Sequence, residues 1–84
     1  MQSFRGAELQ GAKFHSRPHA AVPRTCASLC NLARFVGKSK CKAAVFYQMT
    51  GGRTRCQLFS TNSDSTTVNK VVTDNRTILF EDQN

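Results

Sequence analysis

The sequence predicts a small α+β domain in which disulfide bonds join one helix to a β-sheet. Apolar side chains stand at helical spacing over residues 23–36, and residues 43–59 form two apolar stretches about a glycine pair, as in a β-hairpin. Of the four cysteines, Cys26 and Cys30 lie in the first segment, Cys56 lies in the second, and Cys41 stands just before the second. A chain of 84 residues buries proportionally little of its surface, and small secreted domains often add disulfides for that reason.

The N-terminal residues predict extended structure. The stretch SFRGAELQGAKFHS, residues 3–16, has two glycine breaks and a brief alternation of apolar and polar residues. We expect one or two short strands there, or an extended arm. RPHAAVP, residues 17–23, should connect this stretch to the next element, because each proline disfavours helix at the residue before it.

A helix is expected at about residues 23–36. Its apolar positions follow the spacing i, i+3, i+4 and i+7 and so share one face: Cys26, Leu29, Cys30 and Ala33. Pro23 suits the first turn of a helix, and Gly37 is the expected stop.

The rest of the chain predicts β-structure. Residues 43–49 and 54–59 are rich in strand formers, and Gly51-Gly52 between them supplies the positive φ angles that a tight turn needs. A polar loop is expected at 60–67, and further strands at 68–72 and 76–81. We expect a single domain over residues 1–84, with its core at about 4–81.

The spacing of the cysteines favours two bonds from helix to sheet. Cys26 and Cys30 project from the same helical face, and a bond between them would need closer Cα atoms than this spacing provides without strain. Cys30, near the helix end, and Cys41, at the start of a strand, are close in the sequence. We therefore expect Cys30–Cys41, which leaves Cys26–Cys56.

The alternative is a zinc site built from four thiolates. Zinc ligands commonly stand at CxxC spacing, whereas three, ten and fourteen residues separate these cysteines. The even number leaves no spare cysteine for a catalytic thiol. We expect neither a metal nor a cofactor.

The same residues resemble the PAN/apple domain family. The stretch TCASLC resembles the helical Cys-x-x-x-Cys of the family, CKAAVFY its central strand and RCQLFS the partner strand. FRGAELQG is similar to the first strand and glycine turn of many members. Within the family, the chain is most similar to the N-terminal domain of hepatocyte growth factor and plasminogen-related proteins.

The resemblance implies an antiparallel sheet of about five strands that packs on one helix, with the disulfides Cys26–Cys56 and Cys30–Cys41. Many members carry a further disulfide between the termini, but this chain has no cysteine near either end. The terminal strands should then be held by hydrogen bonds alone and fray more easily. Family members are non-enzymatic extracellular modules that bind proteins or carbohydrates.

The charge of the chain predicts an anionic partner. Lys and Arg outnumber Asp and Glu by 12 to 5, and residues 1–56 contain ten basic residues but only one acidic residue, Glu8. Such a surface attracts polyanions. We expect an acidic glycan such as heparin or heparan sulfate, and the candidate contacts are Lys38, Lys40, Lys42, Arg53 and Arg55, with Lys13, Arg17 and Arg24 as a second group. The alternative is solvated charge without a specific ligand.

Two departures from growth-factor relatives argue against an identical heparin site. Leu29 stands where those relatives have an arginine, and Leu32 where they have a basic residue. A protein partner at the open face of the sheet is the competing expectation, with Tyr47 and Phe59 as exposed anchors. A lectin-like pocket for a neutral or sialylated sugar has no marker in the sequence.

Other functions lack their motifs. The sequence contains no zinc finger, helix-turn-helix, HExxH, GxSxG or phosphate loop, and we expect neither an enzyme nor a nucleic-acid-binding protein.

No apolar stretch of the sequence is long enough to span a membrane. We expect an extracellular or secreted domain whose leader has been removed, or part of a larger ectodomain. Asn75-Arg76-Thr77 fits the N-glycosylation triplet.

Overall fold

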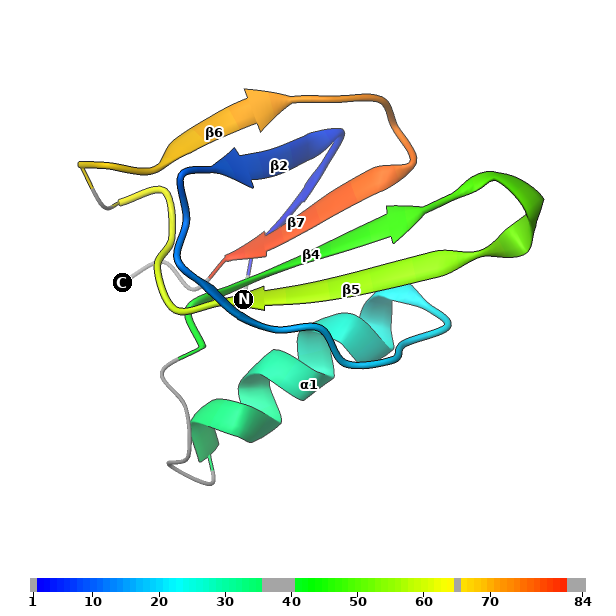
Figure 1. The fold of residues 1–84 in the computed structure, drawn as a ribbon, viewed down its shortest axis with the longest axis horizontal. Helices are drawn as coiled ribbons and strands as arrows, with labels where there is room; N and C mark the ends of the chain where they lie inside the picture. The colour runs from blue at the N-terminus through cyan, green and yellow to red at the C-terminus, as the bar shows by residue number, and fades with distance from the viewer. Residues whose placement is uncertain (1, 36–40, 65, 82–84) are drawn as a thin grey trace.

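The structure is a computed structural model that describes residues 2–35, 41–64 and 66–81. Within them the chain forms seven strands and one helix (Figure 1). In chain order these are β1 Gln2–Arg5, β2 Ala7–Gln10, β3 Phe14–Ser16, α1 Pro23–Phe35, β4 Ala43–Gln48, β5 Thr54–Phe59, β6 Asn69–Val72 and β7 Thr77–Glu81. The expected α+β fold is confirmed, and α1 begins at Pro23 as expected. Gly37, the expected helix stop, lies outside the described residues.

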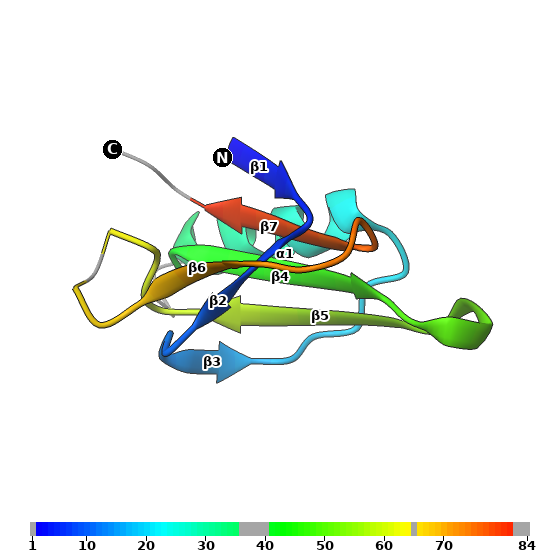
Figure 2. The same ribbon diagram turned by 90° about the horizontal axis from the view of Figure 1, so that it is seen from above.

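Five strands form one antiparallel sheet in the order β1-β7-β4-β5-β3, and β2 pairs with β6 in a separate two-stranded sheet. Figure 2 shows the five strands in this order, with the β2–β6 pair on one side and α1 on the other. The five-stranded sheet is therefore the middle of three layers. Its two edges are β1 and β3.

The central strand β4 is buried on both faces because successive side chains point to opposite sides. Ala44 and Phe46 pack toward α1 in a cluster that contains all four cysteines. Ala43 and Val45 belong to a second cluster on the other face, together with Leu79 of β7. Because the sheet is packed on both faces, nearly all residues of β4 are apolar.

Two disulfides attach α1 to the chain around the sheet. Cys26 bonds Cys56 of β5 with a Cα–Cα distance of 5.6 Å, and Cys30 bonds Cys41, just before β4, at 5.5 Å. The expected pairing is confirmed. All four sulfurs lie in the core cluster beneath the helix and none is free, which excludes the zinc alternative.

The N-terminal stretch forms three strands, where one or two or an extended arm were expected. Gly6 has a φ of 79° at the turn between β1 and β2. Gly11 follows β2 with a φ of 83°, and a Cβ atom there would lie 2.6 Å from the carbonyl oxygen of Thr67. Only glycine fits this close approach, which lets the chain leave β2 and reach the far edge of the large sheet.

The hairpin between β4 and β5 closes as expected. Gly51 and Gly52 have φ values of 77° and 78°, within a short 3-10 turn at Thr50–Gly52. The Met49 N–H donates a hydrogen bond to the carbonyl oxygen of Arg53 at 2.8 Å. This turn fixes the register so that Tyr47 lies opposite Arg55.

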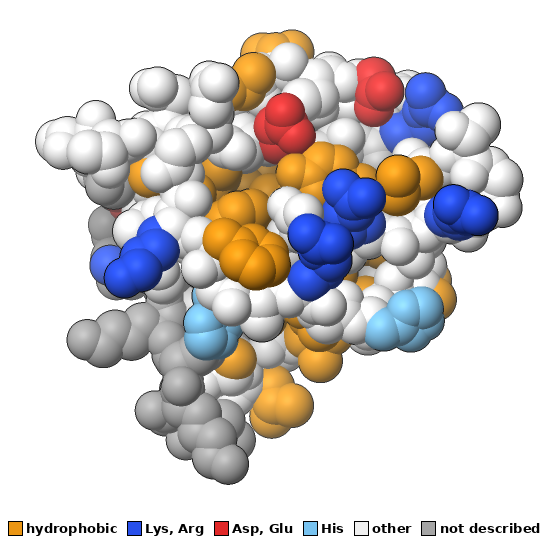
Figure 3. Space-filling view, in the orientation of Figure 1, with side chains coloured by type: hydrophobic (Ala, Val, Ile, Leu, Met, Phe, Trp, Pro, Cys, Tyr) orange, Lys and Arg blue, Asp and Glu red, His pale blue; other side chains and the backbone are white. Residues whose placement is uncertain are grey.

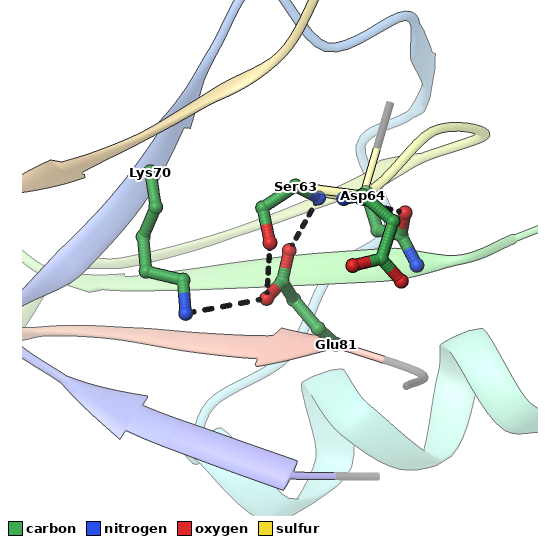
Figure 4. Close-up of polar contacts among 5 residues, drawn as sticks. Ser63, Asp64, Lys70 and Glu81 are labelled. Carbon is green, nitrogen blue, oxygen red and sulfur yellow. Dashed lines mark hydrogen bonds and ion pairs between the residues drawn. The ribbon is translucent and has the colours of Figure 1, made fainter. Parts of the chain in front are cut away.

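A buried carboxylate ties the C-terminal strand to its surroundings. Glu81 of β7 is fully buried, and it accepts hydrogen bonds from the Ser63 N–H at 2.7 Å and the Ser63 hydroxyl at 2.9 Å. The ammonium of Lys70 in β6 lies 3.7 Å from the same carboxylate and 3.6 Å from the centroid of the Phe4 ring in β1. Figure 4 shows Ser63 and Lys70 reaching Glu81 from two sides. The terminal strands are thus joined by side-chain contacts as well as by the hydrogen bonds expected from the sequence.

Candidate functional site

Three arginines line one hollow of about 590 Å³ at the hairpin end of β5. Arg17 comes from the connector before α1, whereas Arg53 and Arg55 come from the second arm of the hairpin. The rest of the lining includes Pro18, His19, Ala21, Met49 and Thr54. The space-filling view shows Lys and Arg side chains gathered beside hydrophobic ones on this face of the molecule (Figure 3). The structure thereby joins members of both basic groups predicted from the sequence.

Within the described part of the chain, no ion pair involves the three arginines of the hollow. No acidic residue lines it, and the ion pairs among the described residues involve other basic side chains, Lys70 with Glu81 and Arg76 with Asp74. Guanidinium groups stay charged at any physiological pH. Their mutual repulsion makes the site electrostatically favourable for an anion.

Aromatic contacts position Arg17. Its guanidinium carbon lies 5.9 Å from the centroid of the Phe14 ring, within the range of a cation–π interaction. Phe14 in turn makes an edge-to-face contact with Phe59, with ring centroids 6.3 Å apart. Phe59 belongs to the core, so this chain of contacts connects Arg17 to a rigid part of the sheet.

The two walls of the hollow are also joined to each other. The Thr54 hydroxyl donates a hydrogen bond to the carbonyl oxygen of Ala20 at 2.7 Å, and Ala20 is buried. The Cys26–Cys56 disulfide joins the helix that follows the connector to β5. The connector and the hairpin arm are therefore held at a fixed distance beneath the arginines.

A tyrosine and a glutamate adjoin the hollow. Burial raises the pKa of Tyr47 to about 12, and the charge of Glu8 and a hydrogen bond to Glu8 act in the same direction. Arg55, directly opposite Tyr47 in the hairpin, lowers this pKa but does not outweigh the other effects. The contact connects β2 to the large sheet beside the basic hollow.

We expect the single tyrosine to ionise at about pH 12 instead of at its ordinary pKa of 10.0. Because folding raises the pKa of Tyr47, the protonated phenol favours the folded state. Its contribution to the free energy of unfolding is complete below the unfolded-state pKa of 10.0 and is lost as the pH rises toward the folded-state pKa of about 12. The phenolate absorbance during an alkaline titration measures this, and no tryptophan interferes. Glu8→Gln should move the midpoint down, toward 10.0. An unchanged midpoint in that variant would contradict the assigned contact.

Two other candidates lie at the opposite end of β5. The Lys42 N–H donates to the carbonyl oxygen of Phe59 at 2.9 Å, and the Ser60 N–H donates to the carbonyl oxygen of Lys13 at 2.9 Å. Lys13 and Lys42 therefore flank the end of β5, on the β3 and β4 sides. Lys42 is thus separated from Arg53 and Arg55, although its place in the sequence predicted a common group.

The remaining basic candidates are not part of the hollow. Lys38 and Lys40 lie outside the described residues, and their role stays a prediction. Arg24, in the first turn of α1, lines a different surface with Arg5 and Ile78, over β1 and β7. Because β1 and β7 form the other half of the sheet from β3 and β5, Arg24 lies apart from the three arginines.

The expected exposure of the two aromatic anchors is wrong for Phe59 and only partly right for Tyr47. Phe59 is buried, because the face opposite α1 has its own core cluster. Tyr47 is half-buried and hydrogen-bonded to the side chain of Glu8. Phe14 is instead the exposed aromatic of this region, at 51%. Phe14 was not predicted as part of the site, and its one signal was its place within the basic stretch KFHSRPH, to which His19 also belongs.

Asn75, the predicted glycosylation residue, is exposed in the turn before β7. Its carbonyl oxygen accepts a hydrogen bond from the Arg5 guanidinium at 3.1 Å. Thr77 of the same triplet begins β7 and is buried. Glycosylation stays a prediction.

The fold and the site define a class of protein: a small disulfide-bonded α+β domain with a basic hollow at one end of its sheet. The model of the PAN domain family matches residues 1–84, and the chain belongs to this family. None of the curated proteins compared with the chain matches it.

PAN domains are recognition modules for protein or carbohydrate partners and are generally non-catalytic. Two disulfides in a domain of this family fit an extracellular or secreted setting. Among the described residues, no cluster of acidic, histidine and cysteine side chains could hold a metal ion. The described part of the chain likewise has no helix with the length and apolar character of a membrane span.

Proposed function

We propose that this PAN domain binds acidic glycans such as heparin or heparan sulfate through its basic surface. The observation that carries the proposal is the hollow lined by Arg17, Arg53 and Arg55, whose lining includes no carboxylate. Arginine binds carboxylates and other oxyanions through charge-assisted and often bidentate hydrogen bonds. Residues 1–84 act as one non-enzymatic binding domain outside the cell.

Lys13 and Lys42 extend this basic surface along β5. Phe59, whose carbonyl oxygen accepts a hydrogen bond from the Lys42 N–H, lies four positions beyond Arg55, which corresponds to about 13 Å of strand. A linear polyanion laid along β5 would contact the hollow at one end and the two lysines at the other. Lys38 and Lys40 lie outside the described residues and stay candidate contacts from the sequence alone.

The test is the salt concentration at which variants elute from immobilised heparin. We expect Arg17→Ala/Arg53→Ala to elute at clearly lower salt than the unchanged domain, because fewer counterions are released when fewer cations meet the polyanion. The matched control is Arg5→Ala/Arg24→Ala, which removes the same charge from the surface over β1 and β7.

The comparison of the two variants decides between a defined site and general attraction. Elution of the control close to the unchanged domain supports a site at the hollow. Equal shifts in both variants would show that only net charge matters, and the proposal would then fail. Circular dichroism of each variant establishes that the fold is retained.

A protein partner is the second candidate function, and one observation favours it. Phe14 and Met49 are 51% and 38% exposed beside the arginines, and exposed apolar side chains next to arginine are typical anchors of protein interfaces. Such a contact would persist at moderate salt, whereas a glycan contact would weaken sharply.

A further inference from the structure

We propose that the hollow binds a single sugar unit that carries a carboxylate directly on its ring, as uronic acids and sialic acids do. The inference rests on the proposed binding of acidic glycans and specifies which group the arginines recognise. It makes the hollow a selective subsite, in contrast to the general attraction of the surrounding basic surface.

The size and lining of the hollow favour a sugar ring over an isolated ion. Its volume of about 590 Å³ lies within the range of small-molecule sites. Pro18, Ala21 and Met49 supply apolar contact, and Thr54 supplies a hydroxyl. The C–H faces of a sugar ring pack against apolar side chains, whereas a free sulfate ion has no apolar surface to pack against them. A purely electrostatic site would not need these apolar residues.

The position of the charge favours a carboxylate. The arginines and the apolar residues share one small hollow, so the ligand must carry its charge close to its ring. In a uronic or sialic acid the carboxylate carbon is bonded to the ring itself. A sulfate ester projects from the ring through an oxygen, and its charge can be bound while the ring stays outside. The planar guanidinium also matches the planar carboxylate in a bidentate pair.

The site is built in advance of binding, which lowers the entropic cost of seating a ligand. Phe14 holds the Arg17 guanidinium, and the bond from Thr54 to the Ala20 carbonyl fixes the connector against β5. Arg53 and Arg55 are two residues apart on an extended segment, so their side chains leave it on the same side.

The decisive experiment compares native heparin oligosaccharides with carboxyl-reduced ones, in which each carboxylate is an alcohol and the sulfates are intact. Titration calorimetry measures both affinities for the unchanged domain, for Arg17→Ala/Arg53→Ala/Arg55→Ala and for the control Arg5→Ala/Arg24→Ala. We expect carboxyl reduction to weaken binding at least about tenfold in the unchanged domain and in the control, as the loss of a charged hydrogen-bond pair would. In the triple variant we expect the ratio of the two affinities to be close to one.

Each other outcome has a definite meaning. If both oligosaccharides bind the unchanged domain equally, the inference fails and the proposed glycan binding stands. If carboxyl reduction weakens the triple variant as much as the unchanged domain, the carboxylate is recognised elsewhere, and the inference also fails. If the domain binds neither native heparin nor the methyl glycosides of glucuronic acid and N-acetylneuraminic acid, the proposed function and the inference fail together.

Binding of the methyl glycosides of glucuronic acid and N-acetylneuraminic acid distinguishes a uronic acid from a sialic acid as the ligand of the hollow. Backbone amide shifts of Met49 and Thr54 report occupancy of the hollow, and the methyl ester of each sugar is its uncharged control. We expect one of the two acids to shift these amides and its ester to leave them unchanged. Equal shifts from acid and ester would overturn the role of the carboxylate.

Discussion

Replacing Cys26 and Cys56 by alanine is expected to lower the free energy of unfolding by about 3–4 kcal/mol, from the chain entropy of a loop whose ends are 30 residues apart. A small domain has only about 5–15 kcal/mol in total, so this change removes a large share of it. Both sulfurs lie in the core cluster between α1 and the sheet, and their loss also loosens the packing there.

Urea unfolding followed by circular dichroism measures the effect, and the second disulfide provides the matched comparison. Cys30→Ala/Cys41→Ala removes an equally buried pair whose residues are only 11 apart in sequence, so the expected loss is smaller, about 3 kcal/mol or less. A larger loss for this second pair would contradict the loop-entropy explanation and point to packing as the dominant effect.

The same substitution connects stability to the site. Cys56 lines the hollow, and Thr54, two residues before it, bonds the connector that carries Arg17. Loss of the Cys26–Cys56 bond should therefore weaken heparin binding more than loss of Cys30–Cys41, under conditions in which both variants remain folded. The arginine residues themselves are unchanged in this comparison, so a difference would reflect their positions.

Local patterns predicted the elements whose contacts are local. The helix at residues 23–35 follows from its apolar spacing, and the hairpin follows from two strand-forming segments about Gly51-Gly52. The three N-terminal strands were harder to predict, because each is short and each pairs with a strand far away in the sequence. β1 pairs with β7 and β2 with β6, and no pattern within residues 3–16 reveals those partners.

The candidate site was predicted in part for the same reason. Arg53 and Arg55 were correctly placed together, because two residues of an extended arm share one side. Arg17 was expected in a separate basic group, and its proximity to Arg53 and Arg55 could not be predicted, since it depends on how residues 17–22 fold back over β5. Lys42 was grouped with them from its place in the sequence, but the antiparallel register puts it beside Phe59.

The burial of Phe59 shows the limit of alternation as a guide to exposure. Gln57 and Phe59 alternate with Cys56 and Leu58, as in a strand with one face in solvent. The second face of this sheet, however, carries the β2–β6 pair and its own apolar cluster. A side chain that points away from α1 is therefore not necessarily exposed.

Replacing Glu81 by alanine is expected to lower the free energy of unfolding by about 2–3 kcal/mol, the usual cost of losing hydrogen bonds to a charged group. The carboxylate accepts two bonds from Ser63, whose N–H would lose its partner in a partly buried position. Lys70, which also lies over Phe4 of β1, would lose its counterion. Glu81 thus connects β7 to Ser63 and to β6, and its loss should release the terminal strands first.

The exposed ion pair between Asp74 and Arg76, 3.5 Å apart, is the natural control. Its side chains are more than half exposed, so Asp74→Ala should change stability by no more than about 1 kcal/mol. Amide hydrogen exchange in Glu81→Ala should accelerate in β1 and β7 before it does in β4 and β5, which the hairpin and the Cys26–Cys56 disulfide hold. Uniform acceleration would contradict this role, because it would mean that Glu81 stabilises the whole domain and does not hold the termini in particular.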